Sequence, residues 1–257
     1  NDLLISLKGI LNGSSNFVLS KVFNDGMTYA DALRLATDAG FVESDPSLDL
    51  DGWDALYKLV ILAVHAFGTY VPPSDIFCYG ISNMNDHDIS FANEKGRRVK
   101  LVGHVEKLSD GQMTMCVMPQ LLSRNKYIYS VEDEFNGVVI KGQYYDKQFM
   151  FGRGAGGFPT ASAVLSDITA CLYDYRYAYK KRTDSTMPSY TDDVVFRIYM
   201  RYNTPHDLSL LHFEEISESY TSDHSNFVVG RVSLASLRAA RDELHRRGIF
   251  LAAYPRD

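Results

Sequence analysis

Residues 41–68 constrain the fold more than any other part of the sequence. Residues 52–67, when placed on a helix, are apolar on almost every side. A helix that is apolar all round is a buried helix, so this segment predicts a sizeable core with covering layers on several sides. Its longest apolar run, residues 59–67, is too short to span a bilayer, and we expect no membrane partner.

Two charged residues, Asp54 and Lys58, interrupt this apolar helix. They are four residues apart and therefore share one helix face. A buried lysine loses hydration, and its charge is costly unless a carboxylate compensates. One interpretation is a structural ion pair at the start of the helix. The other is a lysine held in a cleft beside several carboxylates, where it gives or takes a proton. Five carboxylates lie within twelve residues here: Glu43, Asp45, Asp49, Asp51 and Asp54.

The same acidic stretch offers oxygen ligands at alternate positions before Gly52, so a calcium loop has to be considered. If Gly52 held the sixth position of an EF-hand loop, Lys58 would hold the twelfth. That position requires a bidentate glutamate, which excludes an EF-hand, and we predict no metal site. A looser cation site is the remaining alternative.

The segments before this helix predict one strand and two helices. Residues 3–11 are expected to form the strand, followed by a short helix that Ser14 or Ser15 would cap. Thr28 with Asp31 predicts the start of a second helix, because the pair resembles a capping box. Gly40 is a natural stop for that helix.

The residue pattern between positions 81 and 151 is typical of β-strands. Two hairpins are predicted there, and the first turns at residues 109–111, which read Ser-Asp-Gly. The glycine-rich loop at residues 152–157 then precedes a helix over residues 161–175. The loop matches GxGxxG but lacks the acidic strand end of a dinucleotide-binding fingerprint, so a tight turn is the favoured interpretation. Alternatively, backbone amides at Gly154 and Gly156 face an anionic ligand between domains.

A separate pattern follows residues 180–189, a polar stretch that reads as a linker. Two strands are predicted, within residues 193–202 and 226–234, and Ser233 caps a helix that stops at Gly248. A closing strand completes the pattern. This order resembles a small ferredoxin-like unit whose first helix is poorly formed.

Composition excludes several classes of protein. The 257 residues carry a net charge of −6 without a basic stripe, which argues against nucleic acid as a partner. No signal peptide is evident. The cysteines, Cys78, Cys116 and Cys171, are odd in number and widely spaced, so we expect reduced thiols in a cytoplasmic protein.

Three stretches together resemble the catalytic part of homoserine dehydrogenase. They are GILNGSSNFVLSKV at residues 9–22, GFVESDPSLDLDGWDALYKLVILAVHAFG at residues 40–68, and GRGAGGFPTASAVLSD at residues 152–167. They occur in the family's order and spacing. The resemblance implies an α+β fold with a mixed, largely antiparallel sheet and helices on one side. It also implies a catalytic and dimerisation domain over residues 1–186 and a small ferredoxin-like, ACT-like domain over residues 187–257.

The resemblance also assigns roles to individual residues. The family interconverts L-homoserine and L-aspartate 4-semialdehyde with NAD(P), in the biosynthesis of threonine, methionine and isoleucine. Asp54 and Lys58 match the pair on the family's catalytic helix. Glu43 matches the carboxylate that holds the substrate ammonium, and Asp49 an acidic residue near the reacting end. The other substrate-contacting positions are Gly13, Ser14, where the family often has threonine, and Phe41, where it often has tyrosine.

A Rossmann domain that binds the cofactor begins the proteins of this family, and this sequence lacks it. We therefore expect the C-terminal portion of a homoserine dehydrogenase, inactive by itself, with NAD(P) bound mainly by the missing domain and by Gly154 and Gly156 at most in part. A small amino-acid substrate and a homodimer paired through the sheet are the partners that the resemblance implies. The alternative is a non-catalytic dimerising or regulatory module that binds an amino acid.

Overall fold

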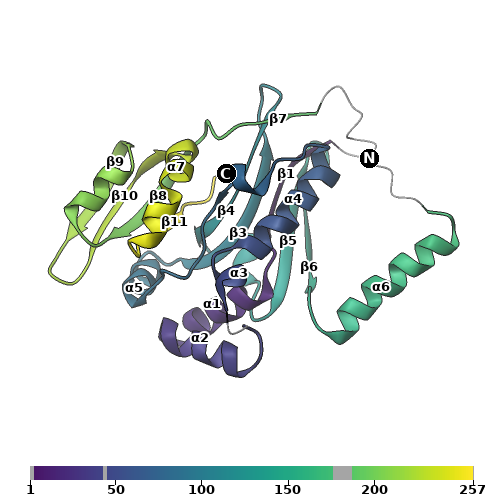
Figure 1. The fold of residues 1–257 in the computed structure, drawn as a ribbon, viewed down its shortest axis with the longest axis horizontal. Coiled ribbons are helices and arrows are strands. Elements are labelled where there is room, and N and C mark those ends of the chain that lie inside the picture. Colours follow the sequence, from purple (N-terminus) through teal and green to yellow (C-terminus); the bar gives the residue numbers. More distant parts are fainter. Residues whose placement is uncertain (1–2, 43–44, 176–186, 257) are drawn as a thin grey trace.

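The computed structural model describes residues 3–42, 45–175 and 187–256 (Figure 1). The strands are β1 (Leu4–Ile10), β2 (Phe77–Cys78), β3 (Arg98–Lys107), β4 (Gln112–Leu122), β5 (Phe135–Gly142), β6 (Lys147–Arg153), β7 (Ser189–Tyr190), β8 (Val195–Tyr202), β9 (Phe213–Thr221), β10 (Asn226–Ser233) and β11 (Phe250–Ala253). The α-helices are α1 (Gly13–Asp25), α2 (Tyr29–Asp38), α3 (Ser47–Leu50), α4 (Trp53–Phe67), α5 (Asp86–Glu94), α6 (Gly157–Leu172) and α7 (Leu234–Arg246).

The strands join into one sheet in the order β6-β5-β1-β3-β4-β11-β8-β10-β9, and β2 and β7 also pair with β4. Pairing is antiparallel except where β2, β7 and β11 meet β4. The predicted hairpin turning at residues 109–111 joins β3 to β4 and aligns Arg98 with Leu122. The predicted α+β class with a largely antiparallel sheet is therefore confirmed.

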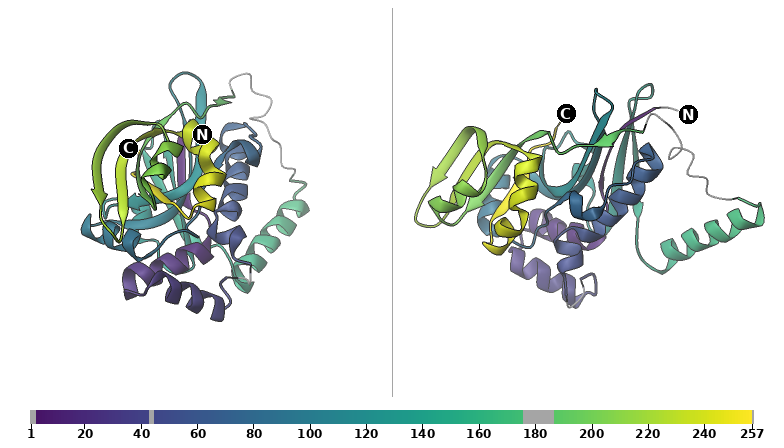
Figure 2. Two further views of the ribbon diagram at one scale, coloured as in Figure 1. Left: turned by 60° about the vertical axis from the view of Figure 1, so that its left-hand side comes forward. Right: turned by 45° about the horizontal axis from the view of Figure 1, so that its top comes forward.

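The main core lies between the sheet and the helices α1, α2 and α4 (Figures 1 and 2). Side chains alternate along a strand, so Leu101 and Val105 of β3 face this core while Val102 faces the other side of the sheet. On that other side Val102 packs with Ile10 and Ile128 in a smaller cluster. One face of α4 packs in the main core, and its opposite face points away from the sheet.

The expectation that α4 is buried all round is wrong. Leu56 and Leu59 are fully buried, whereas Tyr57 is 48 % and Ile61 57 % exposed. The side chain of Lys58 is 48 % exposed and lies on this open side. The reason is geometric: α4 rests on the sheet with one face, and no other described element covers its outer face.

Several boundaries differ from those predicted. Asn12, not Ser14 or Ser15, caps α1, and its side chain accepts a hydrogen bond from the Ser15 amide. α5 occupies residues 86–94, inside the stretch predicted to form strands, because Asn85 and Asp88 build a complete capping box there. The strand β9 was not predicted. By contrast, Thr28 caps α2 as expected, and Gly40 follows it with a positive φ of 76°.

The C-terminal part of the sheet has the order β11-β8-β10-β9 with α7 packed against it, and a 3₁₀ helix (Pro205–Leu210) stands in the slot of a first helix. This order fits the predicted ferredoxin-like unit. Ala253 of β11 pairs with Gln120 of β4, so the strands continue into the N-terminal sheet. The predicted linker lies mostly outside the described residues, and a domain boundary at residue 186 stays a prediction.

The helix α6 stands apart from the sheet (Figure 1). None of its residues is buried, and Phe158 and Leu172 are 93 % and 78 % exposed. No helix in the described part of the chain is long and apolar enough to cross a membrane. The three cysteines carry free thiols, as predicted.

Candidate active site

Asn12 forms the centre of a cluster of charged groups at the junction of β1 and α1. The Asn12 side chain is buried, with 5 % of the residue exposed. Its amide nitrogen donates hydrogen bonds to Asp49 Oδ1 at 2.6 Å and to Asp54 Oδ2 at 2.8 Å. Its oxygen accepts the Ser15 amide at 2.8 Å, which starts α1. One side chain therefore caps a helix and holds two carboxylates from two other helices.

Lys58 completes this cluster. Its Nζ donates to Asp54 Oδ2 at 2.7 Å and to the carbonyl oxygen of Leu11 at 3.1 Å. Asp54 and Lys58 lie on successive turns of α4, so the pair of sequence-predicted residues is brought together as their spacing requires. The Asp54 side chain is 26 % exposed and that of Lys58 48 % exposed. The pair is thus open to a ligand.

The hydrogen-bonding capacity of these groups matters for chemistry. An ammonium group has three N–H bonds, and the described contacts of Lys58 use two of them. The NH₂ group of Asn12 uses both of its N–H bonds, on Asp49 and Asp54. The arrangement therefore leaves one N–H of a carboxylate-paired, half-exposed lysine without a described acceptor, and such a donor is able to stabilise a negatively charged oxygen.

The predicted substrate-contacting positions near Asn12 are only partly assembled. Gly13 is the first residue of α1, and a β-carbon there would lie 2.7 Å from the carbonyl oxygen of Glu134, so the close approach requires glycine. Ser14 follows in the same turn and is half-buried. Phe41 lies after α2 and stacks on Phe17 with ring centroids 4.3 Å apart.

The remaining predicted positions are Glu43, Gly154 and Gly156. Glu43 lies outside the described residues. Gly154 and Gly156 lie between β6 and α6, and they take no part in the polar network around Asn12. Gly156 has a φ of 107°, and nothing approaches a β-carbon there more closely than Pro159 at 3.8 Å. Within the described part, no group of three or more His, Cys, Asp or Glu residues could hold a metal ion.

Sequence reasoning missed Asn12. The signal was present, because asparagine directly before a helix is a strong capping residue. The two serines that follow it competed for the same role. The contacts to Asp49 and Asp54 join residues 37 and 42 positions apart, a relation that no local pattern contains.

The fold is that of solved oxidoreductase structures. A homoserine dehydrogenase from Thiobacillus denitrificans aligns with 99 % of this chain and 64 % of its own, at a TM-score of 0.78 and 25 % identity. A hyperthermophilic archaeal homoserine dehydrogenase in complex with NADPH aligns with 68 % of this chain and 49 % of its own, at a TM-score of 0.56 and 32 % identity.

The sequence comparisons identify the family. The sequence model of homoserine dehydrogenase matches residues 1–169. The homoserine dehydrogenase of Corynebacterium glutamicum is 39 % identical over 189 residues, which are 72 % of this chain and 42 % of that protein. The chain belongs to the homoserine dehydrogenase family. The chain covers 42 % of the relative from Corynebacterium glutamicum and 40 % of the homoserine dehydrogenase of Bacillus subtilis. It therefore spans less than half the length of either protein.

Proposed function

We propose that this chain is the substrate-binding and catalytic portion of an NAD(P)-dependent enzyme that interconverts L-homoserine and L-aspartate 4-semialdehyde. The observation that carries the proposal is the Lys58 ammonium, held between Asp54 and the Leu11 carbonyl with one donor left over. Family membership argues against the alternative of a non-catalytic amino-acid-binding module.

In the direction of aldehyde reduction, Lys58 acts on the carbonyl oxygen. Its remaining N–H donates a hydrogen bond to that oxygen, and the bond strengthens as alkoxide character develops. The Lys58 ammonium then transfers a proton to this oxygen, which completes the hydroxyl group of homoserine, and solvent returns a proton to the lysine. Asp54, with 2.7 Å between its Oδ2 and Lys58 Nζ, holds the ammonium in place.

The other end of the substrate carries an ammonium and a carboxylate. Glu43, by resemblance to the family, neutralises the ammonium. Asp49 lies beside Asp54 because both accept hydrogen bonds from Asn12, and it retains lone pairs for a substrate donor. We assign Asn12 a positioning role, because its own hydrogen bonds are all used within the protein.

The nicotinamide cofactor supplies the two-electron reducing equivalent when bound. The relative solved with NADPH supports this cofactor class. Within the described residues, the turn at Gly154 and Gly156 is the candidate contact, since no atom lies closer than 3.8 Å to a β-carbon on Gly156 and α6 begins directly after it. By resemblance to the family, most of the cofactor contacts would come from the family's N-terminal Rossmann domain.

We further propose a homodimer paired through the edge strand β6. Phe149, Met150 and Phe151 on this strand are 37 %, 56 % and 53 % exposed, and an uncovered apolar edge strand favours pairing with another chain. The ACT-like assignment of the C-terminal unit is supported by its strand order and by the 3₁₀ helix in its first helix slot. A dimer mass by light scattering at micromolar concentration is the expected result, and a monomer mass would refute the pairing.

The longer protein that contains this chain should oxidise NADPH or NADH when L-aspartate 4-semialdehyde is added, measured by loss of absorbance of the reduced cofactor. For an aldehyde of the same length that lacks the amino group, KM should be much higher than for L-aspartate 4-semialdehyde, because Glu43 then has no ammonium to bind. The chain of 257 residues alone should show no turnover. Absence of turnover by the longer protein with either cofactor would refute the proposed function.

A further inference from the structure

The turn between α3 and α4 connects the two carboxylates of the site. It consists of Asp51 and Gly52, with Asp49 two residues before it and Asp54 two residues after it. The segment at Gly80 and Ile81 of the same chain packs tightly against this turn. A β-carbon on Gly80 would lie 1.8 Å from the Leu50 carbonyl oxygen, and the Ile81 amide donates to that oxygen at 2.7 Å. Any displacement of the turn therefore displaces both carboxylates relative to Asn12.

A second support for this turn comes from the C-terminal unit. His245 Nε2 on α7 lies 3.2 Å from Asp51 Oδ1, although the two residues are 194 positions apart. One turn earlier on α7, the Arg241 guanidinium lies 5.4 Å from the centre of the Trp53 ring. A cavity of about 230 Å³ lies beside these contacts. These two contacts are the ones that the C-terminal unit makes with the turn. From the N-terminal part, the Ser82 hydroxyl donates to Asp51 Oδ1 and the Cys78 thiol donates to the Asp51 carbonyl oxygen.

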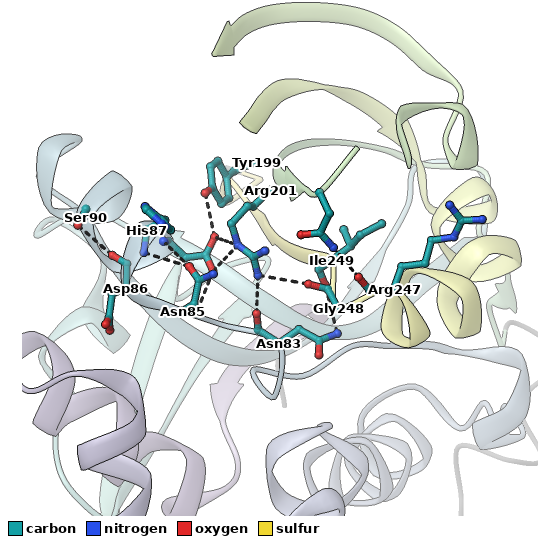
Figure 3. A network of polar contacts seen from close by, with 12 residues as sticks. Asn83, Asn85, Asp86, His87, Ser90, Tyr199, Arg201, Arg247, Gly248 and Ile249 are labelled. Carbon is teal, nitrogen blue, oxygen red and sulfur yellow. Dashed lines mark hydrogen bonds and ion pairs between the residues drawn. The ribbon is translucent and has the colours of Figure 1, made fainter. Parts of the chain in front are cut away.

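The end of α7 is itself fixed to the N-terminal part of the chain. Asn83 Nδ2 donates to the carbonyl oxygens of His245 at 3.1 Å and Ile249 at 3.3 Å. Arg201 donates to the Asn83 carbonyl at 2.6 Å and to the Gly248 carbonyl at 3.3 Å, so it joins the two sides of the interface (Figure 3). The position of α7 is therefore defined independently of its contact with Asp51.

We propose that His245 and Arg241 are positioning residues through which the C-terminal unit holds the turn between Asp49 and Asp54 and so fixes the relative position of these two carboxylates. Neither residue touches the substrate. Loss of the contacts loosens the turn, and an error of about 1 Å in such a group costs up to about 100-fold in rate. The kinetic part of this inference rests on the proposed function, whereas the structural part does not.

The structural part is tested with Trp53, the one tryptophan among the 257 residues. Its fluorescence reports directly on the turn. In the chain of 257 residues, His245→Ala and Arg241→Ala should increase quenching by acrylamide and lower the fluorescence anisotropy. Arg238→Ala is the matched control, because Arg238 lies on the same helix but pairs with Asp192 and does not line the cavity beside Trp53. His245→Gln retains a donor for Asp51 and should restore the wild-type signal.

The kinetic part is tested in the longer protein that contains the chain. His245→Ala should lower kcat about tenfold and leave KM within about twofold, with recovery in His245→Gln. Unchanged quenching and unchanged kcat in His245→Ala, or equal effects in Arg238→Ala, would overturn the inference. If the wild-type protein shows no homoserine dehydrogenase activity, the proposed function fails while the fluorescence experiment still decides whether α7 holds the turn.

Discussion

Two carboxylate–cation pairs in this molecule have similar distances and very different surroundings. Lys58 Nζ and Asp54 Oδ2 are 2.7 Å apart, and both side chains are partly exposed, at 48 % and 26 %. Arg201 Nε and Asp88 Oδ1 are 3.0 Å apart, with side-chain exposures of 8 % and 0 %. The first pair lies on the open side of a helix and the second between α5 and the C-terminal sheet.

The buried pair is saturated with partners. Asp88 accepts hydrogen bonds from the Tyr199 hydroxyl at 2.9 Å, from the Asn85 amide at 2.8 Å, and from Arg201 on both oxygens. Burial raises the pKa of Asp88, and the Arg201 charge and these hydrogen bonds oppose that rise. Such a group is suited to holding two elements together, since it has no capacity left for a ligand.

The exposed pair is not saturated. Lys58 retains an N–H donor, and Asp54 retains lone pairs beside those that Asn12 and Lys58 occupy. Burial therefore distinguishes these two ion pairs more clearly than distance does, and the exposure of the first pair favours the role proposed for Lys58. The sequence left both interpretations of this pair open, and the exposed face of α4 that carries Lys58 was not expected for a helix so apolar.

The largest expected effect on stability concerns the buried pair. Arg201→Met leaves the Asp88 carboxylate without its cation and should lower the free energy of unfolding by about 3–5 kcal/mol. Arg231→Met is the matched control, because Arg231 pairs with Glu214 at 3.6 Å on the surface and is 54 % exposed. Urea denaturation of both variants measures the difference. Equal losses in the two variants would contradict the contrast drawn between buried and exposed pairs.

Lys100 extends the comparison to a buried cation without a carboxylate in hydrogen-bond contact. It is 1 % exposed, and its Nζ donates to Asn16 Oδ1 at 2.9 Å and to the Val131 carbonyl at 2.6 Å. Burial lowers the pKa of Lys100 to about 7. The unfolded chain holds this proton to about pH 10, so between pH 7 and 9 it binds more protons than the folded chain.

Folding stability should consequently rise with pH across this window, by about 2 kcal/mol from this residue. Lys100→Met removes the titration. The free energy of unfolding of the wild type should therefore increase relative to that of the variant from pH 7 to pH 9. Burial also raises the pKa of Cys78 and Cys116 to about 12, but their opposite contribution cancels in that difference. A difference independent of pH would show that Lys100 keeps its proton throughout.

The smallest expected effect on stability belongs to the proposed catalytic pair. Lys58→Met should change the free energy of unfolding by less than about 1 kcal/mol, because a half-exposed ion pair contributes little. Asp54 stays hydrogen-bonded to Asn12 in this variant. Thermal and urea unfolding of the purified chain test this value, and a loss as large as that of Arg201→Met would identify the pair as structural.

Local sequence signals predicted much of this architecture. The cap at Thr28, the stop at Gly40 and the spacing of Asp54 and Lys58 depend on neighbours within four residues, and all three are found in the structure. The capping box that starts α5 is equally local, but the surrounding strand-like pattern obscured it.

Relations between distant segments could not be predicted in this way. The hydrogen bonds from Asn12 to Asp49 and from Arg201 to Asp88 depend on how the sheet brings together residues 37 and 113 positions apart. The exposure of Lys58 depends on which face of α4 meets the sheet, and hydrophobic periodicity did not define a single face on a helix so rich in apolar residues.

The most direct test of the central claim is the steady-state kinetics of Lys58→Met in the longer enzyme, with folding checked by circular dichroism. Loss of the donor to the reacting oxygen should lower kcat by about 10²–10³-fold, because that interaction is strongest in the transition state. KM should change little, since Lys58 is not the group that binds the substrate ammonium. A correctly folded variant with unchanged kcat would contradict the catalytic assignment and leave Asp54 and Lys58 as a structural ion pair.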